Sequence, residues 1–211
     1  MQTAPSFNAP ENSAPENRAT GNRAPDSGVL PTRTVSNPFL LAAALGGAVS
    51  VAIGTYGRVH TPTGHGIVAF GFPAVLPMKA WFTTVAAVLV IGQLVSALWL
   101  YGRLPRTGAA PSWVAPVHRW SGTAAFLVTL PVAYHCLWAL GFQDSSPRVL
   151  VHSLLGCAFY GVFATKMLVL RSDHVPDWAL PLTGAAFVTV LAAIWTTSSL
   201  WFFQNFGFPG V

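Results

Sequence analysis

Two histidines stand in apolar stretches on either side of a short polar turn, in the segment YHCLWALGFQDSSPRVLVHSLLG, residues 134–156. His135 lies eight residues before Gln143, and His152 lies eight residues after Asp144. If both stretches are helices that run antiparallel from this turn, the two imidazoles lie at the same depth. A neutral imidazole offers one lone-pair nitrogen, and two such nitrogens that face each other can hold a haem iron from both sides. We therefore expect His135 and His152 to bind one haem b.

Glycines at helical spacing support this expectation. Gly122 follows His118 by four residues in HRWSG, and Gly156 follows His152 by four residues in HSLLG. Residues i and i+4 share a helix face, so each glycine leaves space for a porphyrin edge one turn beyond an imidazole. Close helix packing through small residues is the alternative explanation of both glycines.

The other histidines are weaker candidates for ligands. His118 lies seventeen residues before His135, which is about 25 Å along a helix axis and would suit a second haem nearer the other membrane surface. Its partner at that depth would be His174, but RSDHVPDW places His174 beyond the helix end, in solvent. His60 and His65 lie in a Gly- and Thr-rich loop, where they either approach the haem or remain solvated. The sequence therefore favours one haem over two.

Composition shows which elements must position these histidines. Hydrophobic residues make up 53% of the 211 residues and charged residues only 8%, against about 25% charged residues in soluble domains. Five apolar stretches approach the length of about 20 residues that crosses a bilayer as a helix, the form in which the backbone satisfies its own hydrogen bonds. The sequence thus predicts an all-α membrane bundle over residues 37–211. Its five transmembrane helices are expected at residues 38–56, 77–101, 116–141, 148–170 and 178–203.

The remaining sequence indicates topology. Residues 1–36 are rich in Pro, Asn, Ala, Ser and Arg and predict a disordered tail. Short loops predict that the last three helices are consecutive antiparallel neighbours. Basic residues gather at one end of the bundle, so the positive-inside rule predicts a cytoplasmic N-terminus and an external C-terminus. That end carries Arg18, Arg23, Arg33, Arg103, Arg106, Arg119, Lys166 and Arg171, whereas the other end carries Arg58, Lys79 and Arg148.

Transmembrane histidines with the H-x-x-x-G spacing of HRWSG and HSLLG resemble the cytochrome b561 and ferric-reductase-like group of membrane haem proteins. The resemblance covers residues 77–203 and rests on His118, His135 and His152. It implies b-type haem held between helices and electron transfer across or within the membrane. Cytochromes b561 typically take ligands from four helices, whereas residues 77–101 and 178–203 contain no histidine here. The chain also resembles small five-span membrane proteins of high-GC bacteria, which implies that it lies in a bacterial plasma membrane.

Together these features predict a membrane b-type cytochrome-like protein that transfers single electrons, and so a candidate transmembrane oxidoreductase. Its electron donor would be a quinol, a small reductant or a separate redox protein. The net charge of +5 reflects topology rather than a nucleic-acid partner. The alternative is a cofactor-free membrane scaffold or accessory subunit with structural histidines, in which the imidazoles bond to the backbone or to each other. A proton relay or another metal is a further role for these imidazoles. A transporter comes last, because no span shows interrupted helices or paired charges.

Overall fold

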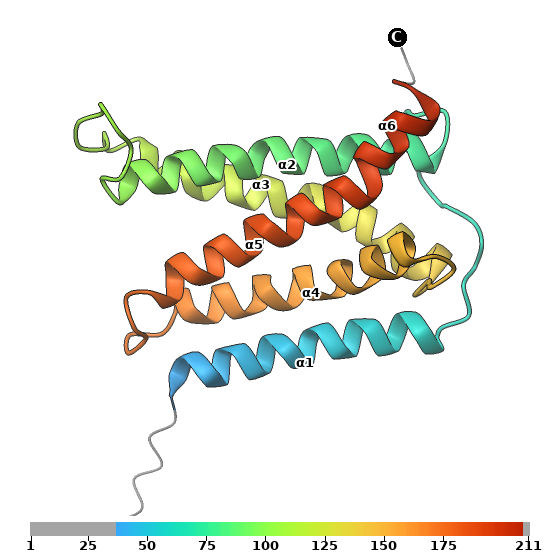
Figure 1. Ribbon diagram of the computed structural model, residues 1–211, viewed down its shortest axis with the longest axis horizontal. Helices are drawn as coiled ribbons and strands as arrows, with labels where there is room; N and C mark the ends of the chain where they lie inside the picture. Colours follow the sequence, from blue (N-terminus) through green and yellow to red (C-terminus); the bar gives the residue numbers. More distant parts are fainter. Residues whose placement is uncertain (1–36, 209–211) are drawn as a thin grey trace, which may run out of the picture. The chain divides into compact units, whose positions relative to one another are not determined.

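The computed structural model of the protein describes residues 37–208, and this part of the chain folds into long helices joined by loops (Figure 1). Five helical stretches within it are long and apolar enough to cross a membrane, which confirms the predicted all-α fold with five spans. The chain is an integral membrane protein that lies in a lipid bilayer. The tail predicted for residues 1–36 lies outside the described residues, as do residues 209–211. The spans are α1 (Pro38–Val59), α2 (Val75–Leu100), α3 (Val114–Tyr134) with turn η1 (His135–Leu140), α4 (Pro147–Leu170), and α5 (Ala179–Trp195) with turn η2 (Thr196–Leu200) and α6 (Trp201–Phe206).

Local capping explains where two of the spans begin. α1 and α4 both start with proline, whose missing N–H has no partner to lose in the first helical turn. The side chain of Asn37 accepts a hydrogen bond from the Phe39 amide at 3.1 Å. The hydroxyl of Ser146 accepts one from the Val149 amide at 3.4 Å. The predicted starts of α1 and α4 therefore lie within one residue of the observed ones.

Two spans contain a turn of π-helix near their C-terminal ends, η1 after α3 and η2 after α5. η1 begins four residues after Pro131, which lies inside α3 and disturbs the preceding turn of hydrogen bonds. In η2, the hydroxyls of Thr196, Thr197 and Ser198 donate to the carbonyls of Ala193 or Ile194. These hydroxyls compete with backbone N–H groups for the same carbonyls, which favours a wider turn. Such wide turns are rare and are frequently found at functional sites.

The packing of the helices differs from their order in the chain. α4 packs between α1 and α5, whereas α3 packs against α2, and α2 also contacts α5 (Figure 1). The prediction that the last three helices are consecutive neighbours is therefore correct for α4 and α5 and wrong for α3 and α4. The backbones of α3 and α4 stay apart although a short turn joins them.

Side-chain size explains this arrangement. A Cβ atom at Gly46 would clash with Thr165 and with the carbonyl of Gly161, so α1 and α4 approach closely through small residues. The face that α4 turns toward α3 carries aromatic rings instead. The Tyr160 hydroxyl lies 3.2 Å from Thr129 Oγ1, and the Phe163 ring stacks on Phe126 with centroids 4.0 Å apart. These large side chains bridge α3 and α4 but keep their backbones apart.

Candidate functional site

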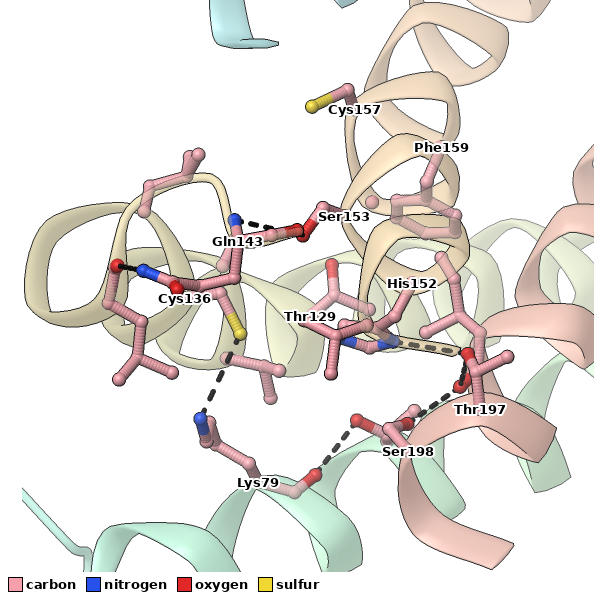
Figure 2. Close-up of a pocket in the computed structure, with 18 of the residues that line it drawn as sticks. Lys79, Thr129, Cys136, Gln143, His152, Ser153, Cys157, Phe159, Thr197 and Ser198 are labelled. Carbon is pink, nitrogen blue, oxygen red and sulfur yellow. Dashed lines mark hydrogen bonds between the residues drawn. The ribbon is translucent and has the colours of Figure 1, made fainter. Parts of the chain in front are cut away.

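A cavity of about 270 Å³ separates α3 from α4 at the end of the bundle that carries residues 141–146, which we call the turn end (Figure 2). α2, α3, α4 and α5 and both π-helical turns contribute to its walls. Most of the lining is apolar, with Phe159, Leu191 and Ile194 among the buried residues that form it. Such a cavity, apolar with a few polar groups, is typical of a site for a small molecule or cofactor.

His152 of α4 lines this cavity, and its imidazole is held by η2. Its Nδ1 lies 3.2 Å from Thr197 Oγ1, as drawn in Figure 2. The Thr197 hydroxyl donates its hydrogen to the carbonyl of Ala193 at 2.8 Å, so its oxygen accepts a hydrogen bond from Nδ1–H. In this tautomer Nε2 carries the lone pair that can bind a metal.

Gly156 lies one helical turn after His152 and also lines the cavity. Apart from the nearby backbone of α4 and the two residues next to Gly156 in the chain, no atom of residues 37–208 lies within 4 Å of the position that a Cβ would take at Gly156. Open space therefore exists next to the imidazole of His152, on the same face of α4.

His135 lies at the turn end too, but at the start of η1 and with only 2% of its surface exposed. Its Nδ1 lies 2.7 Å from the carbonyl of Pro131, which can only accept, so Nδ1 is protonated and Nε2 carries the lone pair. Nε2 is buried without a hydrogen-bond partner in the described part of the chain. The neighbouring Cδ2 atom lies 3.2 Å from where a Cβ of Gly66 would stand. The ring thus faces the loop between α1 and α2, and Cys136 lines the cavity in its place. Of the two predicted ligands, only His152 lines the cavity.

His118 lies at the opposite end of the bundle, in the contact between α2 and α3. Its Nδ1 lies 2.7 Å from Ser96 Oγ, and the Gln93 amide donates to the His118 carbonyl and to Ser121 Oγ. A Cβ at Gly122 would lie only 2.8 Å from Gln93 Oε1. The amide of Gln93 therefore occupies the space beside Gly122, and this polar cluster joins two helices.

The remaining histidines lie in loops or at a helix end. His174 lies in the loop between α4 and α5, at the surface of the bundle. His65 is exposed, with Nδ1 2.7 Å from the carbonyl of Thr63. The ring of His60 stacks between Tyr56 and Trp138, and its Nε2 lies 3.2 Å from the Trp138 carbonyl. His60 therefore fastens the end of α1 to η1.

The cavity is also lined by two basic residues, Lys79 of α2 and Arg148 of α4. In the sequence, both indicate only topology. Arg148 Nη1 donates to the Thr197 carbonyl at 2.7 Å, and its guanidinium carbon lies 3.9 Å from the centre of the Trp201 ring. Lys79 Nζ lies 4.0 Å from the sulfur of Cys136. A basic residue near a helix start is a common membrane anchor, so the sequence held no signal that these two converge with His152.

The fold and the site define a class of protein: a five-span helical membrane protein with a largely apolar cavity of about 270 Å³ between α3 and α4. Residues 39–210 match a family of unknown function, DUF6529, and the chain belongs to that family. No curated protein and no solved structure matches the chain.

Proposed function

We propose that this protein is a membrane b-type cytochrome-like protein, which holds one haem in the cavity between α3 and α4 and transfers single electrons. The observation that supports this most strongly is the arrangement of His152. Thr197 fixes its Nδ1, so that Nε2 keeps a lone pair at a cavity wall, and Gly156 leaves open space beside it. Metal-bound histidines generally have their second nitrogen fixed by a hydrogen bond in this way.

His135 is our candidate for a second residue that would hold the haem iron. Its Nδ1 is fixed by the Pro131 carbonyl, and its buried Nε2 lacks a partner within the described residues. A buried polar atom without a partner costs about 1–3 kcal/mol, which coordination of a metal would offset. Because the ring faces Gly66 in the described structure, ligation at the cavity requires η1 or the side chain to turn.

Haem supplies the one-electron redox chemistry when it is bound, and the protein tunes it through ligands and surroundings. Here Phe159, Leu191 and Ile194 keep water from the inner part of the cavity. The electron donor and acceptor would be quinols, small reductants or separate redox proteins that reach the turn end. Gln93 occupies the space beside Gly122, which favours one haem at the turn end over a second haem near His118 and His174.

The direct test is optical. Protein purified in mild detergent from haem-replete cells is expected to show, after reduction with dithionite, the sharp visible bands of low-spin haem. A pyridine haemochrome assay should give close to one haem b per chain. A colourless protein from cells that load a control cytochrome would contradict the proposal.

A cofactor-free scaffold or accessory subunit is the second candidate function. The cluster of His118, Ser96, Gln93 and Ser121 favours it, because there a membrane histidine forms part of a hydrogen-bonded contact between two helices. If the other histidines have the same purpose, the purified protein should be colourless and its cavity should accept no porphyrin.

We further propose that the turn end faces outward from a bacterial plasma membrane, with the N-terminus in the cytoplasm. At the turn end the Arg58 guanidinium is neutralised by Asp144 at 2.9 Å, whereas Arg103, Arg106 and Arg171 follow helices that end at the opposite side. A single cysteine introduced at exposed Ser145 should react with a membrane-impermeant maleimide in intact cells. A cysteine at Thr107 should react only after permeabilisation, and the reverse pattern would contradict this orientation.

A further inference from the structure

Lys79 and Arg148 are two cationic residues that line the cavity; Figure 2 labels Lys79. We infer that they form a binding site for the carboxylate of an amphiphile whose apolar body fills the cavity. Two sources have this chemistry: the propionates of haem and the head group of a long-chain fatty acid. The first source rests on the proposed function, whereas the second does not.

The charge balance of the cavity supports this inference. Between residues 37 and 208 the acidic residues are Asp144, Asp173 and Asp177. Asp144 pairs with Arg58 at 2.9 Å, and this is the ion pair found in the described part of the chain. Both Lys79 and Arg148 are half-buried at the cavity wall. Withdrawing a cation from water without an anion is costly, so an acidic group on the ligand would stabilise both.

The hydrogen-bond donors of Lys79 are largely unused. Its ammonium has three donors, and the contact that the structure shows for it is the Cys136 sulfur at 4.0 Å. Sulfur is a weak acceptor, so this contact does not compete with a carboxylate. In Figure 2 the Lys79 side chain extends from α2 toward Cys136, across the side of the cavity that faces η1.

Arg148 is held in place from the other side of the cavity. The bond from its Nη1 to the Thr197 carbonyl and its position over the Trp201 ring fix the guanidinium. A guanidinium carries five N–H donors in one plane, so further donors remain for a carboxylate. Charge-assisted hydrogen bonds of this kind are about twice as strong as neutral ones.

The rest of the cavity lining suits the apolar part of such an amphiphile. Phe159, Leu191 and Ile194 are buried apolar residues of the same cavity. An amphiphile would therefore place its carboxylate at the turn end and its apolar part toward the middle of the bundle. A lysine that only anchors its helix extends toward the headgroup region rather than into a cavity.

The test compares each acid with its neutral ester on the full-length protein in detergent. One arm uses the fluorescent fatty acid cis-parinaric acid and its methyl ester, and the other uses haem and haem dimethyl ester. The acid is expected to bind the wild-type protein about 10- to 100-fold more tightly than its ester in one arm at least. Lys79→Gln and Arg148→Gln should each reduce this preference about tenfold, whereas Lys79→Arg should keep it.

Arg58→Gln is the matched control, because it removes the same charge at the same end of the bundle from a side chain that pairs with Asp144. Arg58→Gln should keep the full preference for the acid over its ester. Comparison with this variant also corrects for the partition of acid and ester into detergent. If Arg148→Gln fails to fold because it loses the bond to Thr197, Lys79→Gln decides the question alone. Within residues 37–208 the contact found for the Lys79 ammonium is the weak one to Cys136, so its loss should leave the fold intact.

The outcomes separate this inference from the proposed function. A colourless protein that prefers parinaric acid to its ester contradicts the haem proposal and supports the carboxylate site. If the protein binds haem as tightly as haem dimethyl ester, and parinaric acid as tightly as its methyl ester, the haem proposal is supported and the carboxylate site is overturned. Failure to bind any of the four probes overturns the site as well, and so does a preference that survives Lys79→Gln.

Discussion

Replacing His152 with alanine is expected to abolish haem binding in the purified protein. The substitution removes the Nε2 lone pair at the cavity wall, which the hydrogen bond to Thr197 presents. Loss of a hydrogen-bond partner behind a ligand already reduces metal affinity about 10- to 100-fold, so loss of the ligand itself should exceed about 100-fold. The reduced spectrum of His152→Ala should therefore lack the bands of low-spin haem, and its pyridine haemochrome signal should fall to background.

Three companion variants sharpen this prediction. His174→Ala should leave the spectrum unchanged, because His174 lies in the loop between α4 and α5, away from the cavity lining. Thr197→Val keeps the ligand but removes the oxygen that accepts from Nδ1, so haem affinity should fall about 10- to 100-fold. His135→Ala should convert the spectrum from low-spin to high-spin if His135 supplies the second ligand. Full retention of the spectrum in the double variant of His135 and His152 would refute this ligand assignment.

Filling the cavity from Gly156 should also prevent haem binding, by a different physical cause. Within residues 37–208 the position that a Cβ would take at Gly156 is open, and Gly156 lines the cavity, so we expect the ring of Gly156→Phe to enter the cavity. The haem content should fall at least about tenfold, because buried apolar side chains pack close together and leave little space for a second group. Thermal unfolding in detergent should occur at the same temperature as in the wild type or higher, because a filled cavity removes empty space.

Gly47→Phe is the control for this substitution. Gly47 lies on the exposed face of α1, and within residues 37–208 the position that a Cβ would take there is also open. The same change in size and hydrophobicity, made outside the cavity, should leave both haem content and unfolding temperature close to the wild-type values. If Gly156→Phe retains full haem content, the haem does not occupy the cavity between α3 and α4.

The sequence by itself determined the five spans and their approximate starts. Both depend on properties that add up along the chain: the length of each apolar stretch, and the prolines and capping side chains at its start, such as Asn37 and Ser146. The spacing of His135 and His152, each eight residues from the polar pair Gln143 and Asp144, is likewise read directly from the sequence. These features are local, so no knowledge of neighbouring helices is needed to predict them.

Only the tertiary structure decided which helices are neighbours and which residues line the cavity. α4 packs against α1 because Gly46 and Gly161 let their backbones approach, whereas the aromatic rings between α3 and α4 keep those helices apart. That separation opens the cavity and brings Lys79 and Arg148 to the same site as His152. The π-helical turn η1 changes the angle at which side chains leave the helix, and His135 faces Gly66 rather than the cavity. Neither effect follows from a regular helical period, because one depends on side-chain fit between distant segments and the other on a local break in that period.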